Sequence, residues 1–369
     1  MKIHILQENL IKVLGKANRI LTSKTQMPVL QNVLLKTENG FLKIVSTNLE
    51  TSIISTVGAK IEKEGSVCVS SKLFLDLIAS LPQETVILES RQEKLIVKTT
   101  RGKAELSGMN PSEFPDIKTG GKAKKTEING KLLKKSLESV LFAAATDEGR
   151  PVLTGVRVVS DSKRLIFAAT DGYRLSVKSV EYSAEDKLDM IVPARAMQEL
   201  VKIISEDKES DEKVSLKRTA DNQLELVFED TQVVARLIDG EYPDYSKIIP
   251  KTHTSRAVFD KNEFEHAVKS ASIFARDNAN IVKVDMKDSN MIVSANSPQV
   301  GQNTVGVDIK LDGEGGSIAF NSRFLTEFLN NCSGEVLTIE MTGSLNPGMF
   351  RVEKDDSLIH IIMPVRVQN

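Results

Sequence analysis

Apolar side chains recur with helical spacing in six segments of the chain. The clearest segment is 7–21, where one stripe contains Leu10, Val13, Leu14, Ala17, Ile20 and Leu21. Lys12, Lys16 and Arg19 fall off this stripe, which is typical of an amphipathic helix with one buried face. The same spacing predicts helices over 70–80, 129–145, 193–206, 260–276 and 321–330.

Between these helices the apolar positions alternate with polar ones, which indicates strands. Val33–Lys36 and Leu42–Val45 flank Asn39-Gly40, a strong hairpin signal. Similar pairs of runs predict strands over 85–89, 95–99, 156–159, 165–169, 213–217, 224–228, 282–286, 291–295, 336–341 and 349–353. The pattern therefore favours an α+β protein with helices over largely antiparallel sheets.

The order of elements occurs three times, and the first two copies keep one spacing. Leu10 recurs as Leu133, and Thr47-Asn48 as Thr170-Asp171, each 123 residues later. The third copy is looser, with Phe264 at the matching helix position. Such self-similarity identifies repeated units. Together with the polar Gly/Lys connector at 118–125, it predicts three domains at 1–118, 126–250 and 252–369.

Composition narrows the class of protein without identifying a partner. The 369 residues are 40% hydrophobic and 27% charged, and the net charge is −1, so the total does not point to nucleic acid. Cys68 and Cys332 lie in different repeats without CxxC spacing, which favours buried, reduced thiols over a bridge or a metal site. The chain has no apolar run of membrane-spanning length, and we expect a cytoplasmic protein.

Catalytic motifs are missing from the sequence. The four histidines are scattered, and neither a phosphate-binding GxxxxGK[ST] loop nor a GxSxG elbow occurs. Asp171 beside Tyr173 and Arg174 is conceivable as a catalytic carboxylate, but no second acid or base stands at a repeat-related position. We therefore expect no enzymatic activity, no metal and no cofactor.

Several short motifs carry a resemblance to a known family. Ala169-Thr170-Asp171-Gly172-Tyr173-Arg174-Leu175, the Glu241–Tyr245 segment EYPDY and the tail Met363–Val367, combined with the triple repeat, resemble the bacterial replicative sliding clamp. This family is the β subunit of the DNA polymerase III holoenzyme, and the resemblance covers the whole chain. It implies that two crescent-shaped subunits close head to tail into a ring around duplex DNA and tether the polymerase without catalysis.

A size estimate is consistent with two chains in the ring. A helix is about 10 Å across, so six helices side by side leave a hole of about 9 Å. The grooves of a DNA duplex alone have depths that add to about 16 Å, so the duplex cannot pass. Twelve helices leave a hole of about 28 Å. A ring around DNA thus requires at least a dimer.

The resemblance also implies which residues contact DNA without reading its sequence. Lys24 and Arg150 match DNA contacts of the family, and the basic residues of the two positively charged predicted helices would face the DNA with them: Lys12, Lys16, Arg19, Lys131, Lys134 and Lys135. A modestly basic lining would hold phosphates while still allowing movement. The alternative from the residues alone is that these lysines form the solvated faces of ordinary amphipathic helices.

Two protein interfaces follow from the resemblance. A cleft for a short partner peptide with apolar and glutamine side chains would be lined by Leu153, Thr170, Gly172, Tyr173, Arg174, Leu175, Pro243, Lys247, Ile248, Asn321, Phe324, Ile361, Ile362, Met363, Pro364, Val365, Arg366 and Val367. The dimer contact would join Ala104 and Leu106 to Ile273 and Phe274 of a second copy. Expected partners are the polymerase III core, the ATP-driven clamp loader and other proteins with a clamp-binding motif. A scaffold with the same fold that does not encircle DNA is the alternative function.

Overall fold

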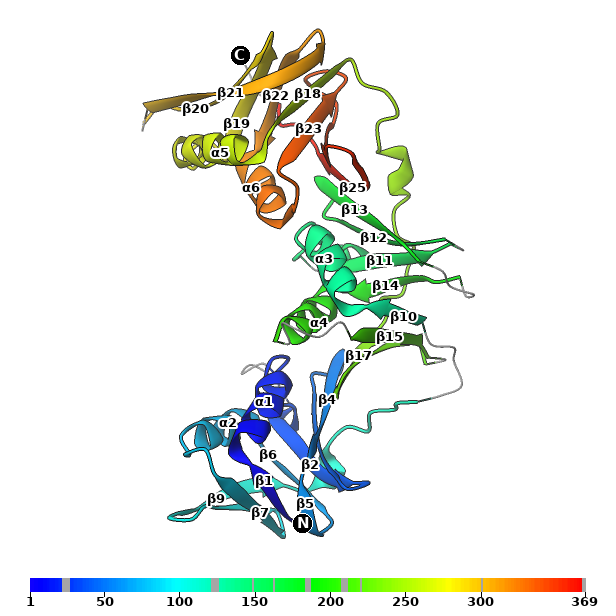
Figure 1. Cartoon of the computed structure of the whole chain (residues 1–369), viewed down its shortest axis with the longest axis vertical. Helices are drawn as coiled ribbons and strands as arrows, with labels where there is room; N and C mark the ends of the chain where they lie inside the picture. The colour runs from blue at the N-terminus through cyan, green and yellow to red at the C-terminus, as the bar shows by residue number, and fades with distance from the viewer. Residues whose placement is uncertain are drawn as a thin grey trace. The chain divides into compact units, whose positions relative to one another are not determined.

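The computed structural model describes residues 1–21, 27–120, 126–147, 149–161, 163–182, 187–206, 212–219, 221–299 and 301–366. Figure 1 labels their helices and strands, and by their contacts they divide into two compact units. Unit 1 comprises residues 1–134 and 195–237, and unit 2 comprises residues 135–194 and 238–369. Two predicted site residues, Lys24 and Val367, lie outside the described residues.

The helices predicted from apolar spacing are present. They are α1 (Gln7–Asn18), α2 (Ser71–Ala79), α3 (Gly130–Leu141), α4 (Ala194–Glu206), α5 (Lys261–Ala275) and α6 (Ser322–Asn331). The largest difference is at α3, which ends four residues before the predicted end at residue 145. There the backbone N–H groups of Ala143 and Ala144 bond three residues back, and that of Ala145 bonds the carbonyl of Leu153 at 2.9 Å. The helix ends because its last N–H groups have these other partners.

Unit 1 contains one antiparallel sheet of 13 strands. Its strands are β1 (Lys2–Leu6), β2 (Asn32–Glu38), β3 (Phe41–Thr47), β4 (Thr51–Gly58), β5 (Lys60–Lys63), β6 (Ser66–Ser70), β7 (Thr85–Arg91), β8 (Lys94–Lys98), β9 (Lys103–Met109), β10 (Thr126–Asn129), β15 (Lys213–Arg218), β16 (Gln223–Phe228) and β17 (Thr231–Arg236). Their order across the sheet is β10-β15-β16-β17-β4-β3-β2-β6-β9-β8-β7-β1-β5.

Unit 2 contains a second antiparallel sheet, of 12 strands. Its strands are β11 (Gly155–Ser160), β12 (Arg164–Thr170), β13 (Arg174–Glu181), β14 (Asp189–Pro193), β18 (Ser255–Asp260), β19 (Ile281–Lys287), β20 (Asn290–Ser297), β21 (Gly301–Gly313), β22 (Gly316–Asn321), β23 (Val336–Met341), β24 (Gly348–Val352) and β25 (Asp355–Ile362). Their order is β14-β11-β12-β13-β25-β24-β23-β18-β21-β20-β19-β22.

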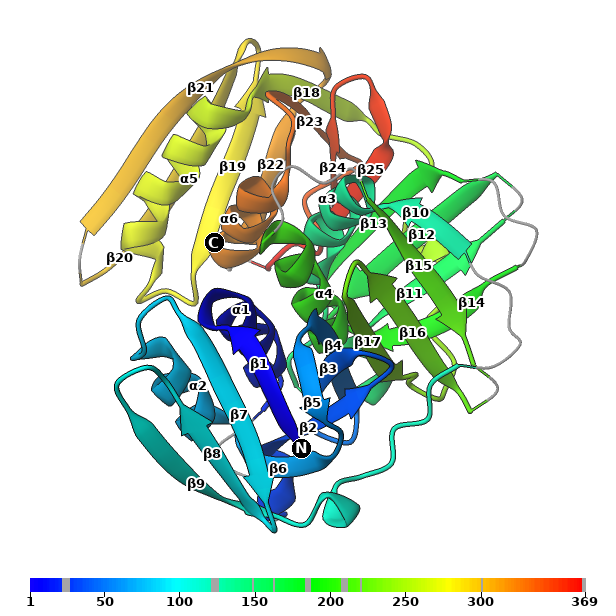
Figure 2. The same cartoon turned by 60° about the horizontal axis from the view of Figure 1, so that its bottom comes forward.

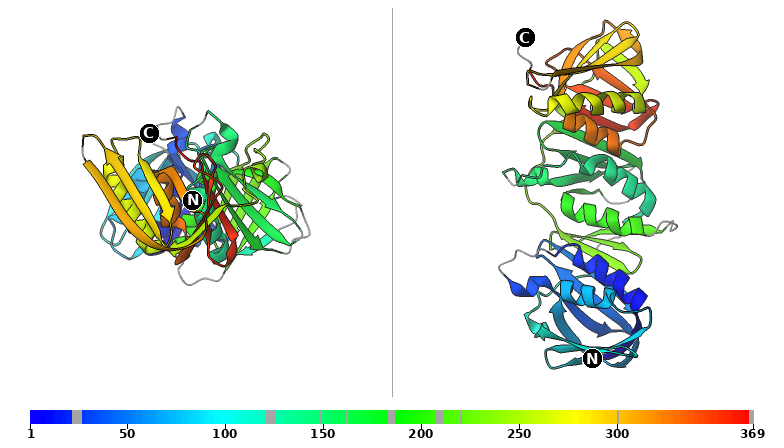
Figure 3. Two further views of the ribbon diagram at one scale, coloured as in Figure 1. Left: turned by 90° about the horizontal axis from the view of Figure 1, so that it is seen from above. Right: turned by 90° about the vertical axis from the view of Figure 1, so that its left-hand side faces the viewer.

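Helices cover one face of each sheet, and the main cores lie beneath them. In unit 1, α1 and α2 contact one another over the sheet, as α5 and α6 do in unit 2 (Figure 3). Figure 2 shows α5 running along β19, β20 and β21, and these elements are in contact. The core of unit 1 includes Leu10, Leu14 and Phe74, and that of unit 2 includes Phe264 and Phe328. This arrangement confirms the α+β prediction.

The central repeat contributes strands to both sheets. Its strands β10 and β15–β17 belong to unit 1, whereas β11–β14 belong to unit 2. Two pairings between successive repeats result. We call β4 with β17 the first junction, and β13 with β25 the second junction. The boundaries predicted near 118–126 and 250–252 are not decided by this division and stay a prediction.

Both cysteines have the buried, reduced state predicted from the sequence. Cys68 and Cys332 are both buried and unbonded. Burial raises the pKa of the Cys68 thiol to about 12 and also raises the pKa of Cys332, so both thiols are protonated and unreactive at neutral pH. None of the described helices has the length and apolar character needed to cross a membrane.

Candidate functional site at the second junction

The second junction begins at a tight turn between β12 and β13. The carboxylate oxygen Oδ1 of Asp171 accepts hydrogen bonds from the backbone N–H groups of Tyr173 at 2.9 Å and Arg174 at 3.0 Å. The Thr170 hydroxyl accepts from the Gly172 N–H at 3.0 Å and donates to the Arg174 carbonyl. Gly172 has φ of +91°, a conformation that glycine adopts without strain. The turn interpretation of Asp171-Gly172 is therefore confirmed.

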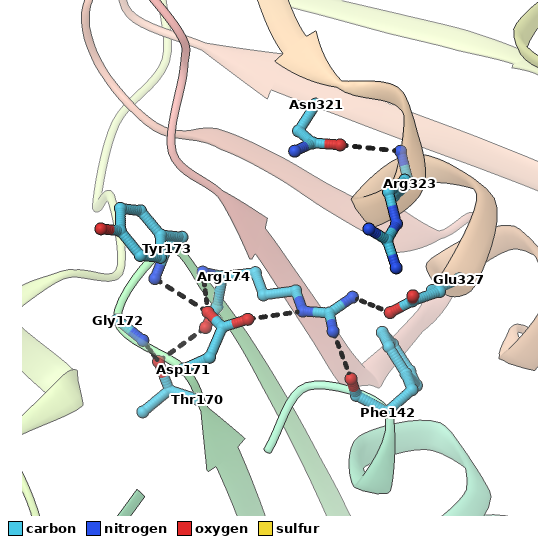
Figure 4. A network of polar contacts seen from close by, with 9 residues as sticks. All are labelled: Phe142, Thr170, Asp171, Gly172, Tyr173, Arg174, Asn321, Arg323 and Glu327. Carbon is cyan, nitrogen blue, oxygen red and sulfur yellow. Dashed lines mark hydrogen bonds and ion pairs between the residues drawn. The ribbon is translucent and has the colours of Figure 1, made fainter. Parts of the chain in front are cut away.

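The side chain of Arg174, at the end of this turn, has contacts on nearly all sides (Figure 4). Its side chain is only 8% exposed, and its Nε donates to Asp171 Oδ2 at 3.1 Å. One terminal nitrogen pairs with Glu327 of α6, and the other donates to the Phe142 carbonyl at 2.5 Å. The guanidinium carbon also lies 4.6 Å from the centre of the Phe324 ring. All three nitrogen atoms of the guanidinium thus have partners, which fixes its orientation, as expected for the planar fork of an arginine.

The segment after β25 runs along the same turn. The Met363 N–H donates to the Tyr173 carbonyl, and the Val365 N–H to the Ala319 carbonyl, both at 2.8 Å. Ile361 and Ile362 are buried, whereas Met363 is 38% exposed and Tyr173 is 68% exposed. Two large apolar side chains therefore stand exposed on adjacent segments. Adaptable methionine and amphipathic tyrosine are side chains suited to binding protein partners.

A third segment, around the EYPDY sequence, packs against the sheet face of this junction. Tyr245 and Ile249 contact a small apolar cluster that includes Leu175 and Ile361. Ile248 is 43% exposed. Tyr242 is buried with its hydroxyl 3.4 Å from the Ala168 carbonyl, and burial raises its pKa. The segment is therefore anchored by its tyrosines while Ile248 remains available.

The structure brings most of the predicted cleft residues into one region of unit 2. Turn residues, β25 and the tail are joined by strand pairing and hydrogen bonds, and α6 joins them through Phe324 and its capping residue Asn321, which accepts from the Arg323 N–H at 3.0 Å. Leu153 and Leu175 are buried below the surface. Lys247 pairs with Asp244 at 3.3 Å, and Arg366 is exposed. Their role in binding a peptide stays a prediction.

Two residues of this site, Phe142 and Glu327, were not predicted from the sequence, and both hold Arg174. Arg150, which was predicted as a DNA contact, lies beside the turn: a Cβ on Gly172 would be 3.5 Å from Arg150 Nη1. The position of Glu327, one helical turn after Phe324, is a signal that could have revealed it. Phe142 acts through its backbone carbonyl, a group that every residue type has, so the sequence gives no signal for it.

The basic residues predicted to contact DNA differ in their surroundings. Lys12, Arg19, Lys131, Lys135 and Arg150 are exposed, and Lys134 is half-buried. Lys16 is buried, and its ammonium lies 2.9 Å from Asp230 Oδ1 and 3.2 Å from the Thr231 hydroxyl. All of these assignments stay predictions. The ion pair argues against a DNA contact by Lys16, because that charge is already neutralised within unit 1.

The predicted dimer residues are also unequal. Ile273 is 55% exposed on α5, and Phe274 is half-buried near Gly301. Ala104 is half-buried, whereas Leu106 is buried in the core of unit 1. In the predicted interface the buried Leu106 would contribute mainly through its backbone, and the interface itself stays a prediction.

Asp171, the carboxylate considered for catalysis from the sequence, is held within the turn. Both carboxylate oxygens of Asp171 are committed, one to two backbone N–H groups and the other to Arg174. This makes Asp171 a structural residue rather than a general base. Among the described residues, no group of three His, Cys, Asp or Glu side chains is arranged to hold a metal ion.

A pocket of about 430 Å³ lies in unit 1, at the end of the β4–β17 pairing that is farther from the turn between β3 and β4. It is lined by Phe41, Ile54 and Val227 together with charged residues. Its carboxylates are engaged, since Glu38 pairs with Lys43 at 3.4 Å and Asp230 pairs with Lys16. None of the predicted site residues lines it.

Family models match nearly the whole chain. The DNA polymerase III beta subunit N-terminal domain matches residues 1–118, its central domain 127–244, and its C-terminal domain 246–366. These matches agree with the triple repeat found in the sequence.

Individual relatives agree with the family models. A protein named beta sliding clamp from Staphylococcus aureus is 28% identical over 379 residues, covering 99% of both chains. The solved DNA polymerase sliding clamp of Bacillus subtilis superposes with a TM-score of 0.95 at 25% identity, and the DNA polymerase III beta subunit of Thermotoga maritima with 0.92 at 25%, each covering both chains fully. The three-domain fold, with helices over antiparallel sheets, is that of these clamps. The chain therefore belongs to the DNA polymerase III beta subunit family, the bacterial sliding clamps.

Proposed function

We propose that this protein encircles duplex DNA as a head-to-tail dimer and tethers the replicative polymerase and other partners through the second junction. It acts by topological linkage and tethering, without catalysis, in the cytoplasm. The observation that carries the ring is a pair of open strand edges, one in each unit.

The repeat explains why these two edges are open. In each repeat the strand after the first hairpin is β4, β13 or the first part of β21, and the closing strand is β9, β17 or β25. Within the chain β4 pairs with β17, and β13 pairs with β25. Among the described residues, Lys103–Ser107 of β9 pair only with β8, and Gly301–Asp308 of β21 pair only with β20. One strand of each kind, β9 and the first part of β21, therefore keeps an open edge.

A second copy of the chain would satisfy both edges at once. An unpaired edge presents backbone donors and acceptors that favour pairing with another strand. Pairing β9 of one copy with β21 of the other, twice, gives a closed arrangement with two-fold symmetry. The register of the two junctions would place Ala104 opposite Asn303 of the partner copy. Asn303 is half-buried at this edge, and its Oδ1 has no hydrogen-bond partner among the described residues.

The second junction supports the tethering function. It combines exposed Tyr173, Met363 and Ile248 with the fixed charge of Arg174. A surface of exposed apolar anchors with a few precisely held polar groups is what short peptide segments bind. Removing residues 363–369 should abolish binding of a clamp-binding peptide while the dimer persists, because one wall of the site is lost. Undiminished peptide affinity after this truncation would contradict the assignment.

A topological experiment tests the ring. The protein is loaded on nicked circular DNA by a cognate clamp loader and ATP, isolated by gel filtration in moderate salt, and the DNA is then linearised. We expect retention on the circle and loss after the cut, because a closed ring slides off a free end. Equal retention on both forms would indicate ordinary contact binding instead.

The alternative of a scaffold that does not encircle DNA is tested in parallel. Cross-linking across β9 and β21, through cysteines at Ala104 and Asn303, should trap a covalent dimer whose retention on circular DNA resists denaturant. A dimer that binds the peptide but is never retained on the circle, with a loader shown to be active on another clamp, would favour the scaffold.

A further inference from the structure

His360 of β25 is a buried titratable side chain that the proposed function does not use. Its exposure is 0%, and neither ring nitrogen has a hydrogen-bond partner among the described residues. Leaving buried polar atoms unpaired is unfavourable, because they lose their hydrogen bonds to water without gaining others. The equivalent positions in the other repeats are occupied by Val233 and Ala104, which have no polar side-chain atoms. A histidine here therefore requires an explanation other than core stability.

The ring of His360 is held between two aromatic side chains. It stacks on Phe328 of α6 with a centroid distance of 4.5 Å and an interplanar angle of 2°. On another side it contacts the Phe142 ring at 5.3 Å and 47°. Its backbone is opposite Ser176 of β13. His360 thus lies where the segment after α3, the helix α6 and the strand β13 meet.

These three elements are the ones that hold Arg174. Arg174 itself begins β13, the Phe142 carbonyl accepts one of its N–H groups at 2.5 Å, and α6 supplies Glu327 and Phe324. The guanidinium carbon is also 5.5 Å from the centre of the same Phe142 ring that His360 contacts. A change in the size or charge of the His360 ring would therefore reach the arginine through Phe142 on one side and through α6 on the other.

The electrostatic surroundings keep this ring neutral. Burial, together with the positive charge of Arg174, lowers the pKa of His360 to about 3. Protonation would place a second cation in the interior beside the guanidinium, with no described carboxylate paired to it. The neutral imidazole instead offers a flat, polarisable ring that is smaller than a phenyl group, and it can stack against Phe328 without competing for Glu327.

We propose that His360 is a positioning residue for the docking site: its neutral ring sets the spacing between Phe142 and α6 and thereby fixes the orientation of Arg174 toward a bound peptide. This inference rests on the proposed docking function of the second junction. His360 itself does not contact the peptide, because it is completely buried.

A double-mutant cycle tests the inference with a synthetic clamp-binding peptide as the probe. The variants are His360→Val, which carries the residue of the first junction, His360→Phe, which keeps a flat ring, and Arg174→Ala, alone and combined. We expect His360→Val to weaken peptide binding about tenfold and His360→Phe by at most about threefold. In the Arg174→Ala background His360→Val should change affinity by less than about twofold, because its effect passes through Arg174.

Phe259→Leu provides a matched control, since Phe259 is buried in the same unit but packs on Phe264 rather than on His360. It should lower stability while leaving peptide affinity unchanged under native conditions. If His360→Val binds like the parent while Arg174→Ala binds weakly, the positioning role is wrong and the docking function stands. If Arg174→Ala itself binds like the parent, Arg174 does not contribute to peptide binding and the positioning role is wrong; if the parent does not bind the peptide, the docking function fails. An equal loss from His360→Val with and without Arg174 would also overturn the positioning role.

Discussion

The first and second junctions are two copies of one backbone arrangement with different side chains. At the first, Asn48 Oδ1 accepts from the N–H groups of Glu50 at 3.1 Å and Thr51 at 2.8 Å, as Asp171 does at the second. The Arg236 N–H donates to the Glu50 carbonyl at 2.8 Å, in the position of the Met363–Tyr173 bond. The Asx turn and the strand pairing are therefore preserved through the repeat.

The side chains placed on this backbone give the two junctions different properties. Thr51 stands where the second junction has Arg174, and it is a small, buried residue. Leu49 stands where the second junction has Gly172, and it keeps a positive φ of +74°. The comparison teaches that the repeat supplies the frame, while a few substitutions turn one copy into a site with a fixed charge and exposed apolar anchors.

Removing the fixed charge should separate the junctions most clearly. Arg174→Ala leaves Glu327 and Asp171 without their cation, and we expect a loss of about 3 kcal/mol in the free energy of unfolding of unit 2, together with weaker but still measurable peptide binding. Thr51→Ala removes part of a buried side chain, so it should cost about 1 kcal/mol and leave peptide binding unchanged. Urea unfolding and peptide titration measure both effects. Similar losses of peptide binding in the two variants would show that the junctions are functionally equivalent.

Acid should destabilise the second junction more than the first through His360. The pKa of this group is lower in the folded state than in the unfolded state, so below about pH 6.5 the unfolded chain takes up the extra proton. Stability present at pH 7 is then lost as the pH falls, by about 2 kcal/mol at pH 5 from this group. Urea unfolding at both pH values should show that His360→Val lacks this component. A parallel fall in the variant would contradict the prediction.

The stability of the two turns should change in opposite directions when glycine is introduced at the first and removed from the second. Leu49→Gly should relieve a left-handed conformation and stabilise unit 1 by about 0.5–1 kcal/mol, whereas Gly172→Ala should destabilise unit 2 by about 1 kcal/mol. Thermal unfolding of the two variants tests this. Destabilisation by Leu49→Gly would mean that the exposed leucine makes contacts that outweigh its backbone strain.

The smallest expected change in stability concerns two lysines of α1. Lys16→Met removes the ion pair with Asp230 at the first junction and should cost less than about 1 kcal/mol, because the carboxylate left behind is 42% exposed to water. It should not alter retention on DNA. Lys12→Glu should leave stability within about 0.5 kcal/mol but weaken retention on circular DNA as salt increases. Retention that depends on Lys16 and not on Lys12 would reverse this assignment.

Local sequence patterns predicted the elements well, because helices and strands are specified by spacing along the chain. The stripe over 7–21 and the Asn39-Gly40 turn correspond to α1 and to the β2–β3 hairpin. The Arg174 site could be predicted only as a list of residues from the family resemblance. Its geometry depends on Phe142 and Glu327, which are far from Arg174 in sequence and belong to no recognisable motif.

By itself the sequence determined the triple repeat, the α+β class and the residues of the turn at 170–174, since each depends on periodicity or on local hydrogen bonding. Only the tertiary structure decided that the central repeat is shared between two sheets, that Lys16 is paired with Asp230, and that His360 lies beneath the partners of Arg174. These are contacts between residues distant in the chain. Burial and charge pairing stabilise them, and both depend on the register of the strands, which no local pattern in the sequence specifies.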